Sequence, residues 1–359
     1  MPPSISGATP CIDDEKSEDG HSLVWTQKIT AKEIEHEENE SLHTSGVKVE
    51  KLKERSSFFE ADLKWKNIIV IATLHIVTLY ILISFPYLEK KGLFFYTFLI
   101  GQIAGFGVTG GAHRLWTHRA FKAKWPLRVI LLYCYCTAGQ NPIYDWVRDH
   151  RIHHKYSETV ADPHDSSRGF FFSHVGWLMM KKHPEVIRRG RQIDMSDIVS
   201  DPVVVFGDKY FLPLKIMCCF IIPSVLPVYL WNEDWYYTII AQIARYILTL
   251  NVTWSVNSAA HIWGAKPYDK QIAPTENHFV AFVAMGEGWH NYHHVFPWDY
   301  KAAELGNYEL NYTTALIDMF AKIGWAYDLK EPSKELVRTV IEKRGDGSHP
   351  TEEPEPKCE

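Results

Sequence analysis

Four long apolar stretches constrain the fold more than any other feature of this 359-residue chain. A helix needs about 20 predominantly apolar residues to cross the hydrocarbon core of a bilayer. Each stretch is long enough, so four transmembrane helices are predicted. In chain order they are NIIVIATLHIVTLYILISFPYL (67–88), LFFYTFLIGQIAGFGVTGGA (93–112), YFLPLKIMCCFIIPSVLPVYLW (210–231) and WYYTIIAQIARYILTLNVTWSVNSAAH (235–261).

Polar residues and prolines interrupt two of these stretches. The third contains Lys215 and three prolines, which weaken its helical pattern. The fourth contains Arg245, and we expect its guanidinium to extend toward the nearer membrane interface. A fifth stretch, WPLRVILLYCYCTAG (125–139), is short and contains Arg128, so it is predicted to lie at the interface rather than to span.

The apolar pattern implies an all-α integral membrane protein with a helical cap. In order, we expect a polar N-terminal tail (1–57), a transmembrane hairpin (58–112), a cap segment (113–208), a second hairpin (209–261), a second cap segment (262–342) and a polar C-terminal tail (343–359). Both tails have the composition of disordered segments. The six scattered cysteines predict no disulfide framework, which fits a reducing compartment, and we find no nucleic-acid-binding motif.

Basic residues predict the orientation of the chain in the membrane. Lys and Arg are concentrated before the first span and between the second and third, whereas the loop at 232–234 is acidic. Lys90 and Lys91 oppose this pattern, but the balance puts both termini and the cap on the cytosolic side. With four spans, every part of the cap emerges on one face.

Nine of the 18 histidines fall into four groups on that face. They are His113 and His118; His150, His153 and His154; His261; and His290, His293 and His294. An α-helix turns by about 100° per residue, so residues four apart share a face while a residue three apart is offset to the other side. The two boxes with this spacing can each offer imidazoles to two adjacent points. Nine imidazoles are too many for one ion, so two metals are predicted.

His113 and His118 are spaced differently from the other boxes. Residues five apart diverge by about 140° on an α-helix, so we expect these two to bracket a metal from a helix end. Imidazole suits zinc, copper, iron and nickel alike, and the residue type alone therefore does not name the metal.

Three other uses of the histidines fit the pattern less well. A structural zinc site takes four ligands, usually with cysteine, and haem would need histidines deep in the spans, where only His75 lies. A solvated basic surface would not repeat the same spacing twice. We expect the remaining histidines outside the tails to pack, to lie on the surface or to form hydrogen bonds: His75, His164, His174, His183 and His278.

The boxes and their context resemble those of the membrane-bound acyl-CoA desaturases. The similarity runs from about residue 65 to 347 and includes GAHRLWTHR, RDHRIHHKYSET, ADPHD, NSAAH, PYDK and GEGWHNYHH. The resemblance implies four transmembrane helices and a cytosolic cap that holds two irons. For one iron it implies the ligands His113, His118, His150, His154 and His293. For the other it implies His153, His261, His290 and His294, with Asn257 reaching the metal through water.

The resemblance also implies an activity in the endoplasmic-reticulum membrane. Cytochrome b5, reduced by its NADH-dependent reductase, would deliver two electrons, and O2 would serve to insert a cis double bond into a fatty acyl-CoA. We expect the Δ9 position and chains of sixteen to eighteen carbons. A different bond position, such as Δ11, and a fatty-acyl hydroxylase are alternatives. A non-catalytic zinc-binding membrane scaffold is the alternative from another class.

The same resemblance implies where the substrate binds. CoA would contact Asn67, Asn141, Arg148, Asp149, Lys181 and Lys182, with Trp254 near the thioester. The bend of the acyl tunnel would be shaped by Gln140, Trp146, Thr253 and Trp254. Spacing alone places Thr253, Asn257 and His261 on one helical stripe. Lys181 and Lys182 could instead form a basic surface near anionic lipid.

Two glycines and several carboxylates complete the prediction. Gly101 and Gly105 match positions that limit chain length, although G-x-x-x-G is also a helix-packing motif. Metal-bound histidines usually donate their second N–H to a carboxylate or carbonyl. We expect one or two such partners among Asp149, Glu158, Asp162, Asp165, Glu287 and Asp299.

Overall fold

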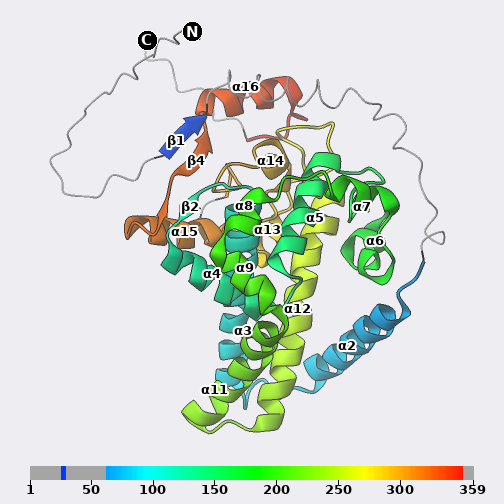
Figure 1. The fold of residues 1–359 in the computed structure, drawn as a ribbon, viewed down its shortest axis with the longest axis vertical. Coiled ribbons are helices and arrows are strands. Elements are labelled where there is room, and N and C mark those ends of the chain that lie inside the picture. Colours follow the sequence, from blue (N-terminus) through cyan, green and yellow to red (C-terminus); the bar gives the residue numbers. More distant parts are fainter. Residues whose placement is uncertain (1–25, 30–61, 307, 351–359) are drawn as a thin grey trace, which may run out of the picture.

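The computed structural model describes residues 26–29, 62–306 and 308–350, and it is built almost entirely of helices. Long helices project from one side of a cap made of shorter helices and loops (Figure 1). The predicted all-α membrane fold is confirmed.

Within the described residues two short sheets occur. Strand β1 (Thr26–Ile29) pairs in parallel with β4 (Leu329–Pro332), and β2 (Lys122–Ala123) pairs antiparallel with β3 (Ala326–Tyr327). Strand β1 lies inside the predicted N-terminal tail, and the rest of 1–57 lies outside the described residues.

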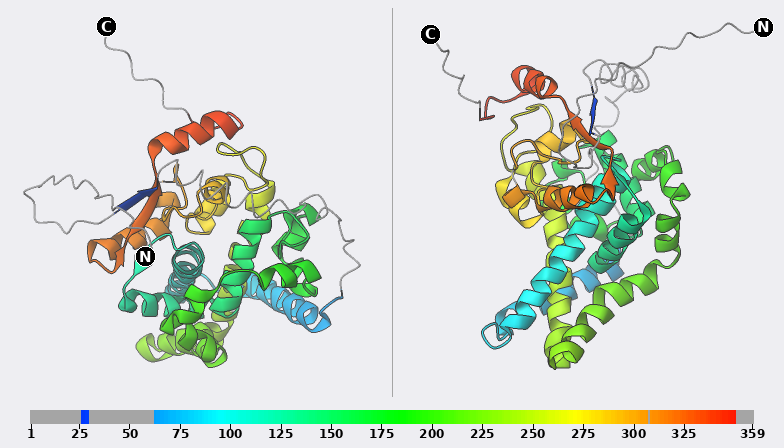
Figure 2. Two further views of the ribbon diagram at one scale, coloured as in Figure 1. Left: turned by 45° about the horizontal axis from the view of Figure 1, so that its top comes forward. Right: turned by 90° about the vertical axis from the view of Figure 1, so that its left-hand side faces the viewer.

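Four helical segments are long and apolar enough to cross a membrane, and they match the four predicted spans. The first is α2 (Trp65–Ser84), and the second is α3 (Lys91–Phe106) continued by η2 (Gly107–Thr117). The third joins α10 (Phe211–Lys215), η5 (Ile216–Ile221) and α11 (Ile222–Trp231), and the fourth is α12 (Trp235–Ile262). Helices α3, α11 and α12 pack together, while α2 diverges from them (Figures 1 and 2).

The cap is assembled from short helices that surround the C-terminal ends of the second and fourth spans (Figure 1). Its elements are α4 (Trp125–Ala138), α5 (Ile143–Tyr156), η3 (Ser166–Arg168), α6 (Phe170–His174), η4 (Gly176–Met179), α7 (Pro184–Gly190), α8 (Ser196–Ser200), α9 (Pro202–Lys209), α13 (His278–Val283), α14 (His290–Val295), η6 (Tyr308–Leu310), α15 (Tyr312–Lys322) and α16 (Lys334–Arg344). The main hydrophobic core joins α3, η2, α4 and α15.

Helix α4 corresponds to the fifth apolar stretch. Its 14 residues rise by about 21 Å, which is less than the roughly 30 Å of a bilayer core. One face is buried against η2 and α3, while Trp125, Val129 and Tyr133 form an exposed stripe one turn apart. This short helix with an exposed apolar stripe agrees with the predicted interfacial position.

Prolines in the third span remove hydrogen bonds that its neighbours replace. Pro223 has no N–H to offer the carbonyl of Cys219, and Pro227 has none to offer the carbonyl of Pro223. The guanidinium of Arg245 donates to the Cys219 carbonyl at 2.6 Å, and the hydroxyl of Tyr96 donates to the Pro223 carbonyl at 3.0 Å. The second and fourth spans therefore complete the hydrogen bonding of the third.

The predicted extension of Arg245 toward the interface is wrong. Its side chain is buried, with 3 % of the residue exposed. Besides Cys219, it donates to the side chain of Gln242 at 2.7 Å and to the carbonyl of Thr137, in the last turn of α4, at 3.1 Å. Backbone carbonyls without other donors are available inside the bundle, so the cation has no need to reach water.

Replacing Arg245 with Met should destabilise the chain, because the carbonyls of Cys219 and Thr137 lose a donor in an apolar environment. Each unsatisfied carbonyl costs about 1–3 kcal/mol. Thermal unfolding of the detergent-purified protein should show a lower midpoint for Arg245→Met. The matched control is Arg338→Met on α16, where the side chain is 81 % exposed and pairs only with Glu342. Equal midpoints for the two variants would contradict this role.

Candidate metal centre

His113 lies in the π-helical segment η2 at the C-terminal end of the second span, and His118 is the residue directly after it. The backbone N–H of His118 donates to the carbonyl of His113, five residues earlier, at 3.1 Å. The wider turn of such a helix brings residues five apart closer to one face than an α-helix does. The two imidazole ring centroids are 4.8 Å apart. The predicted divergence of about 140° is wrong because it assumed an α-helix.

Close packing against α4 fixes this segment. A Cβ atom at Gly107 would lie 2.1 Å from the backbone nitrogen of Tyr135, so only glycine permits the contact. The other histidines come from three further elements. Helix α5 carries the second box, α14 carries the third, and His261 lies in the last turn of α12.

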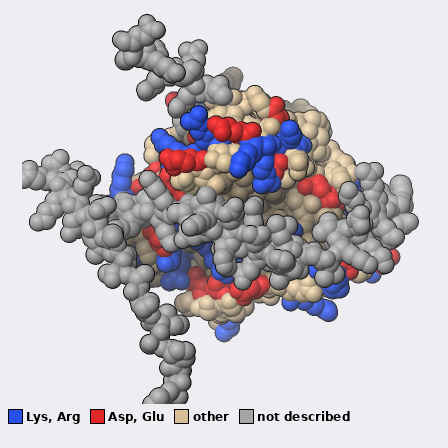
Figure 3. Space-filling view, turned by 90° about the horizontal axis from the view of Figure 1, so that it is seen from above, with Lys and Arg blue, Asp and Glu red and all other residues tan. Residues whose placement is uncertain are grey.

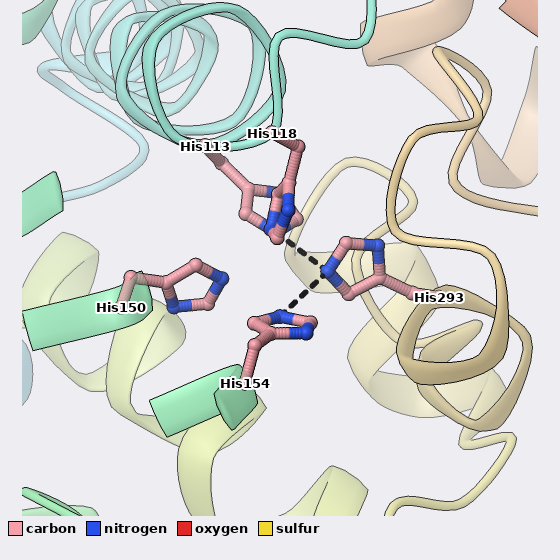
Figure 4. A group of neighbouring side chains, drawn as sticks. All are labelled: His113, His118, His150, His154 and His293. Atoms are coloured by element: carbon pink, nitrogen blue, oxygen red, sulfur yellow. Dashed lines mark hydrogen bonds between the residues drawn. The ribbon is translucent and has the colours of Figure 1, made fainter. Parts of the chain in front are cut away.

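The structure brings the nine histidines into two groups. In each group the ligand nitrogens lie within 4.8 Å of one another. One group consists of His113, His118, His150, His154 and His293, and their imidazoles point toward one another (Figure 4). The other consists of His153, His261, His290 and His294. These are the two sets that the resemblance assigned to two metal ions. Asn257 lines the cavity beneath them.

In the first group, ring nitrogens of different histidines face one another at short distance, an arrangement that suits a bound cation. The Nε2 atom of His293 lies 2.9 Å from Nε2 of His113 and 3.0 Å from Nε2 of His154. The Nδ1 atom of His113 lies 2.7 Å from a carboxylate oxygen of Glu287. Two lone pairs would repel at this distance, so Nδ1 carries the proton and Nε2 of His113 presents a lone pair to its neighbours.

The second group repeats this arrangement. The Nδ1 atom of His261 lies 2.8 Å from Glu158, and its Nε2 faces Nε2 of His290 at 3.0 Å. The Nδ1 atom of His153 lies 2.9 Å from Asp162, and its Nε2 is buried without a protein partner. Carboxylates thus fix the tautomer of histidines in both groups so that Nε2 lone pairs converge.

Unpaired nitrogens give a second measure of the fit to metal ions. The Nε2 atoms of His118, His150 and His153 are buried and form no hydrogen bond with the protein. A buried polar atom without a partner costs about 1–3 kcal/mol. A bound metal ion would satisfy these atoms, and an all-imidazole set suits the transition metals.

The surroundings of six of the imidazoles favour the neutral form, which is the form that binds metals. Burial, followed by repulsion from neighbouring imidazoles, holds the pKa well below its usual value for His118, His150, His154, His290, His293 and His294. His153 differs from these. Burial lowers the pKa of His153, but the Asp162 carboxylate outweighs burial and the net shift is upward.

The carboxylates that contact the histidines are ionised. Burial alone would raise the pKa of Glu287, but Arg114 and His113 outweigh it and lower the pKa to about 2. The same competition, with a histidine partner, lowers the pKa of Glu158 and of Asp162. Three carboxylates therefore contact the histidines, where we expected one or two. The other three have different partners: Asp149 pairs with Arg148 and Lys182, Asp165 accepts from the Ser167 N–H, and Asp299 accepts from the Tyr292 hydroxyl.

Arg114 is a residue that the sequence analysis missed. It is 1 % exposed and donates through Nε and a terminal nitrogen to Glu287, at 3.0 and 2.9 Å. It also donates to the carbonyl of Tyr300 and to Thr314 and Asn311. Arg114 therefore ties the first box to the third box and to α15. In the sequence, the only indication of this role is that Arg114 directly follows His113.

The remaining histidines are placed mostly as expected. His174 contacts Ser258 and Asn251, His183 caps α7, His278 packs on Trp289, and His75 contacts Asn251. His164 is not on the surface. It is buried against Trp177, with Nδ1 3.7 Å from Asp162, and burial lowers its pKa to about 3.

An apolar cavity of about 810 Å³ lies directly beneath the histidines. His113, His150, Trp146 and Thr253 line it, and so do Gly101 and Gly105. The indole N–H of Trp146 donates to Gln140 at 2.8 Å, and the amide of Gln140 donates to Thr253 at 2.9 Å. Three of the four residues expected at the bend are thus linked. Trp254, the fourth, packs on His75 and His174.

Most of the residues expected to bind CoA are linked to one another. Arg148, Asp149 and Lys182 are joined by ion pairs, and Lys181 pairs with Asp62. The Asn67 amide donates to the Leu178 carbonyl, beside the segment that carries Lys181 and Lys182, and Asn141 is exposed.

Comparison with known proteins identifies the class of this chain. The sequence profile of the fatty acid desaturase family matches residues 91–328. The chain is 56 % identical over 292 residues to an acyl-CoA Delta-9 desaturase of Acheta domesticus, covering 81 % of each chain. It is 51 % identical over 288 residues to an acyl-CoA Delta(11) desaturase of Spodoptera littoralis, covering 80 % of this chain and 85 % of the relative.

The chain belongs to the fatty acid desaturase family, which confirms the resemblance seen in the sequence. It is a multi-pass membrane oxidoreductase of lipid metabolism, with histidine clusters able to bind metal. An acyl-CoA Delta12-desaturase of Acheta domesticus is also 49 % identical over 295 residues, with 81 % of this chain and 82 % of the relative covered. Relatives at similar identity therefore differ in the bond position that their names state.

Replacing Asp162 with Asn should weaken metal retention by the second group. The amide cannot accept from His153 Nδ1 with the strength of a carboxylate, and such changes cost about 10–100-fold in metal affinity. The measurement is the rate of metal loss from the purified protein to a chelator. Asp165→Asn, three residues away, is the control because Asp165 accepts only from the Ser167 backbone and side chain. Equal loss rates for the two variants would contradict the role of Asp162.

Proposed function

We propose that this chain is an acyl-CoA desaturase with a di-iron centre. It uses O2 and electrons from cytochrome b5 to insert a cis double bond, most readily at Δ9, into saturated chains of sixteen to eighteen carbons. The observation that carries the proposal is the position of the first histidine group at the head of an apolar cavity, with the second group directly beside the first. A metal pair at this point faces the interior of an acyl chain rather than its end.

The bound iron pair would supply, with O2, the oxidising power that side-chain acids and bases lack. Overall, two hydrogens from adjacent carbons, two electrons and two protons reduce one O2 to two waters. The protein supplies the position of the chain and a dry environment. The apolar walls from α2, α3, α12 and α15 exclude water from the reacting segment.

The hydrogen-bonded chain of Trp146, Gln140 and Thr253 would hold the bend of the tunnel. Trp146 stacks on His150 with ring centroids 5.0 Å apart, so it also fixes the distance between the cavity wall and the first histidine group. Through these contacts the acyl chain is turned past the metal centre. The bond position would then be set by how many carbons fit between the CoA site and this bend.

The CoA group would bind outside the tunnel on the ion-paired residues of the cap. Arg148 pairs with both Asp145 and Asp149, and Lys182 also pairs with Asp149, so a CoA phosphate would replace these carboxylates as the partner of the two cations. Lys181 is 67 % exposed and could add a second contact. The thioester end would pass between these residues and Asn67.

Electrons would come from cytochrome b5 and its NADH-dependent reductase on the cytosolic face of the endoplasmic reticulum. On the described part of the cap seen from above, Lys and Arg are interspersed with Asp and Glu (Figure 3). The arrangement of basic residues in the sequence supports cytosolic termini.

Cytosolic termini predict that Asn39, in the sequon Asn39-Glu40-Ser41, carries no glycan. Endoglycosidase treatment of the chain expressed in animal cells should leave its gel mobility unchanged. A mobility shift that Asn39→Gln abolishes would contradict the proposed topology.

The proposed activity is tested by expressing the chain in a yeast that lacks its own desaturase. We expect new Δ9-unsaturated chains of sixteen and eighteen carbons when double bonds are located by mass spectrometry. A bond at another position would keep the chemistry and revise the tunnel geometry, and a hydroxylated product would favour the alternative chemistry. No product, with protein and cytochrome b5 both present, would contradict the proposal and favour a zinc-binding scaffold.

A further inference from the structure

Met285 occupies the space that a side chain at Gly105 would take. A Cβ atom at Gly105 would lie 2.6 Å from the sulfur of Met285 and 3.7 Å from its Cγ. Both residues line the cavity, and Met285 is 4 % exposed. The wall of the cavity at this depth is therefore formed by a methionine from the loop after α13 instead of by a side chain of α3.

The backbone holds Met285 at this place. Its φ of 58° lies in the left-handed region, which non-glycine residues seldom adopt. Its carbonyl accepts the N–H of Thr313 at 3.2 Å. The next residue, Gly286, has a φ of 111°, and a Cβ there would lie 2.4 Å from Oδ1 of Asn311. The backbone therefore has little room to shift, and only the flexible methionine side chain can move.

Gly105 and Met285 lie partway along the cavity, where they can limit its width. Gly105 lies two helical turns from His113 toward the far side of the membrane, and Gly101 lies one turn further. A Cβ at Gly101 would meet only Cγ of Arg245, at an ordinary 3.9 Å. The cavity continues past both glycines to Phe94, so an occupant that reaches its end must pass Met285.

We propose that Met285 sets the width of the cavity in the part beyond the histidines, and that Gly105 and Met285 together determine which chain lengths are accepted. Gly105 can be glycine because Met285 already fills its side-chain space. A larger residue at 105 displaces the Met285 side chain into the tunnel, which closes the segment that the longer acyl chains need. The inference rests on the proposed function for its substrate class, and it adds a residue to the two glycines.

The test is rescue by a second substitution. Gly105→Leu should lower the ratio of eighteen-carbon to shorter unsaturated products, and a misfit of this size in an apolar pocket changes selectivity by about tenfold or more. Met285→Ala in the same chain should return the ratio to within about twofold of the wild type, because it vacates the space that leucine needs. Products are measured in the desaturase-deficient yeast and normalised to the amount of protein.

Gly101→Leu is the matched control. It also narrows the tunnel, but its neighbour is Arg245, so Met285→Ala should not rescue it. The proposal is overturned if Met285→Ala fails to rescue Gly105→Leu while both proteins fold equally well. It is also overturned if Met285→Ala rescues the two glycine variants equally.

Ligand-induced stabilisation separates this proposal from the proposed function. The thermal shift that acyl-CoA of fourteen, sixteen or eighteen carbons produces in the purified variants needs no turnover. Gly105→Leu should lose the shift with the eighteen-carbon ligand, and the added Met285→Ala should restore it. If the wild-type chain shows the shift but forms no double bond, the desaturase proposal fails while the pair is still tested.

Discussion

The contacts of buried carboxylates with the Nδ1 atoms of three histidines are the interactions on which the rest of the centre depends. Asp162 and Glu158 are hydrogen-bonded to Nδ1 of His153 and His261, and Glu287 lies 2.7 Å from Nδ1 of His113. Each carboxylate favours the tautomer with the proton on Nδ1, which leaves the lone pair of Nε2 directed toward the neighbouring histidines. Without these partners, neutral imidazoles at about 3 Å would pair with one another as donors and acceptors. With these carboxylates in place, both histidine groups present convergent nitrogen lone pairs in a buried space.

Those carboxylates in turn hold distant parts of the chain together. Glu287 joins the first box, through His113 and Arg114, to the loop that precedes α14. Glu158 joins the end of α5 to the last turn of α12 through His261. The membrane helices therefore do more than anchor the cap, because η2 and α12 carry histidines of the two groups near their C-terminal ends and also line the cavity. The centre and the tunnel share the same two helices.

Much of this arrangement could be predicted from the sequence. The four spans follow from apolar length, and the division of His150 and His154 from His153 follows from α-helical spacing. The π-helical turn at His113 and His118 could not be predicted, since this segment packs closely on α4 at Gly107 and that contact is tertiary. The burial of Arg245 also depends on tertiary structure, because its acceptors, the carbonyls of Cys219 and Thr137, come from two other helices. Met285 carries no sequence signal, since its role comes from facing Gly105 across the cavity.

The central claim is that two all-imidazole groups bind two metal ions above one apolar cavity. The most direct test is to purify the full chain from iron-supplemented cells and to determine metal and protein in the same sample, with X-ray absorption to identify the ligand atoms. The account predicts two irons per chain with nitrogen as the main ligand. A single metal per chain, or a shell made mainly of oxygen or sulfur, would contradict it.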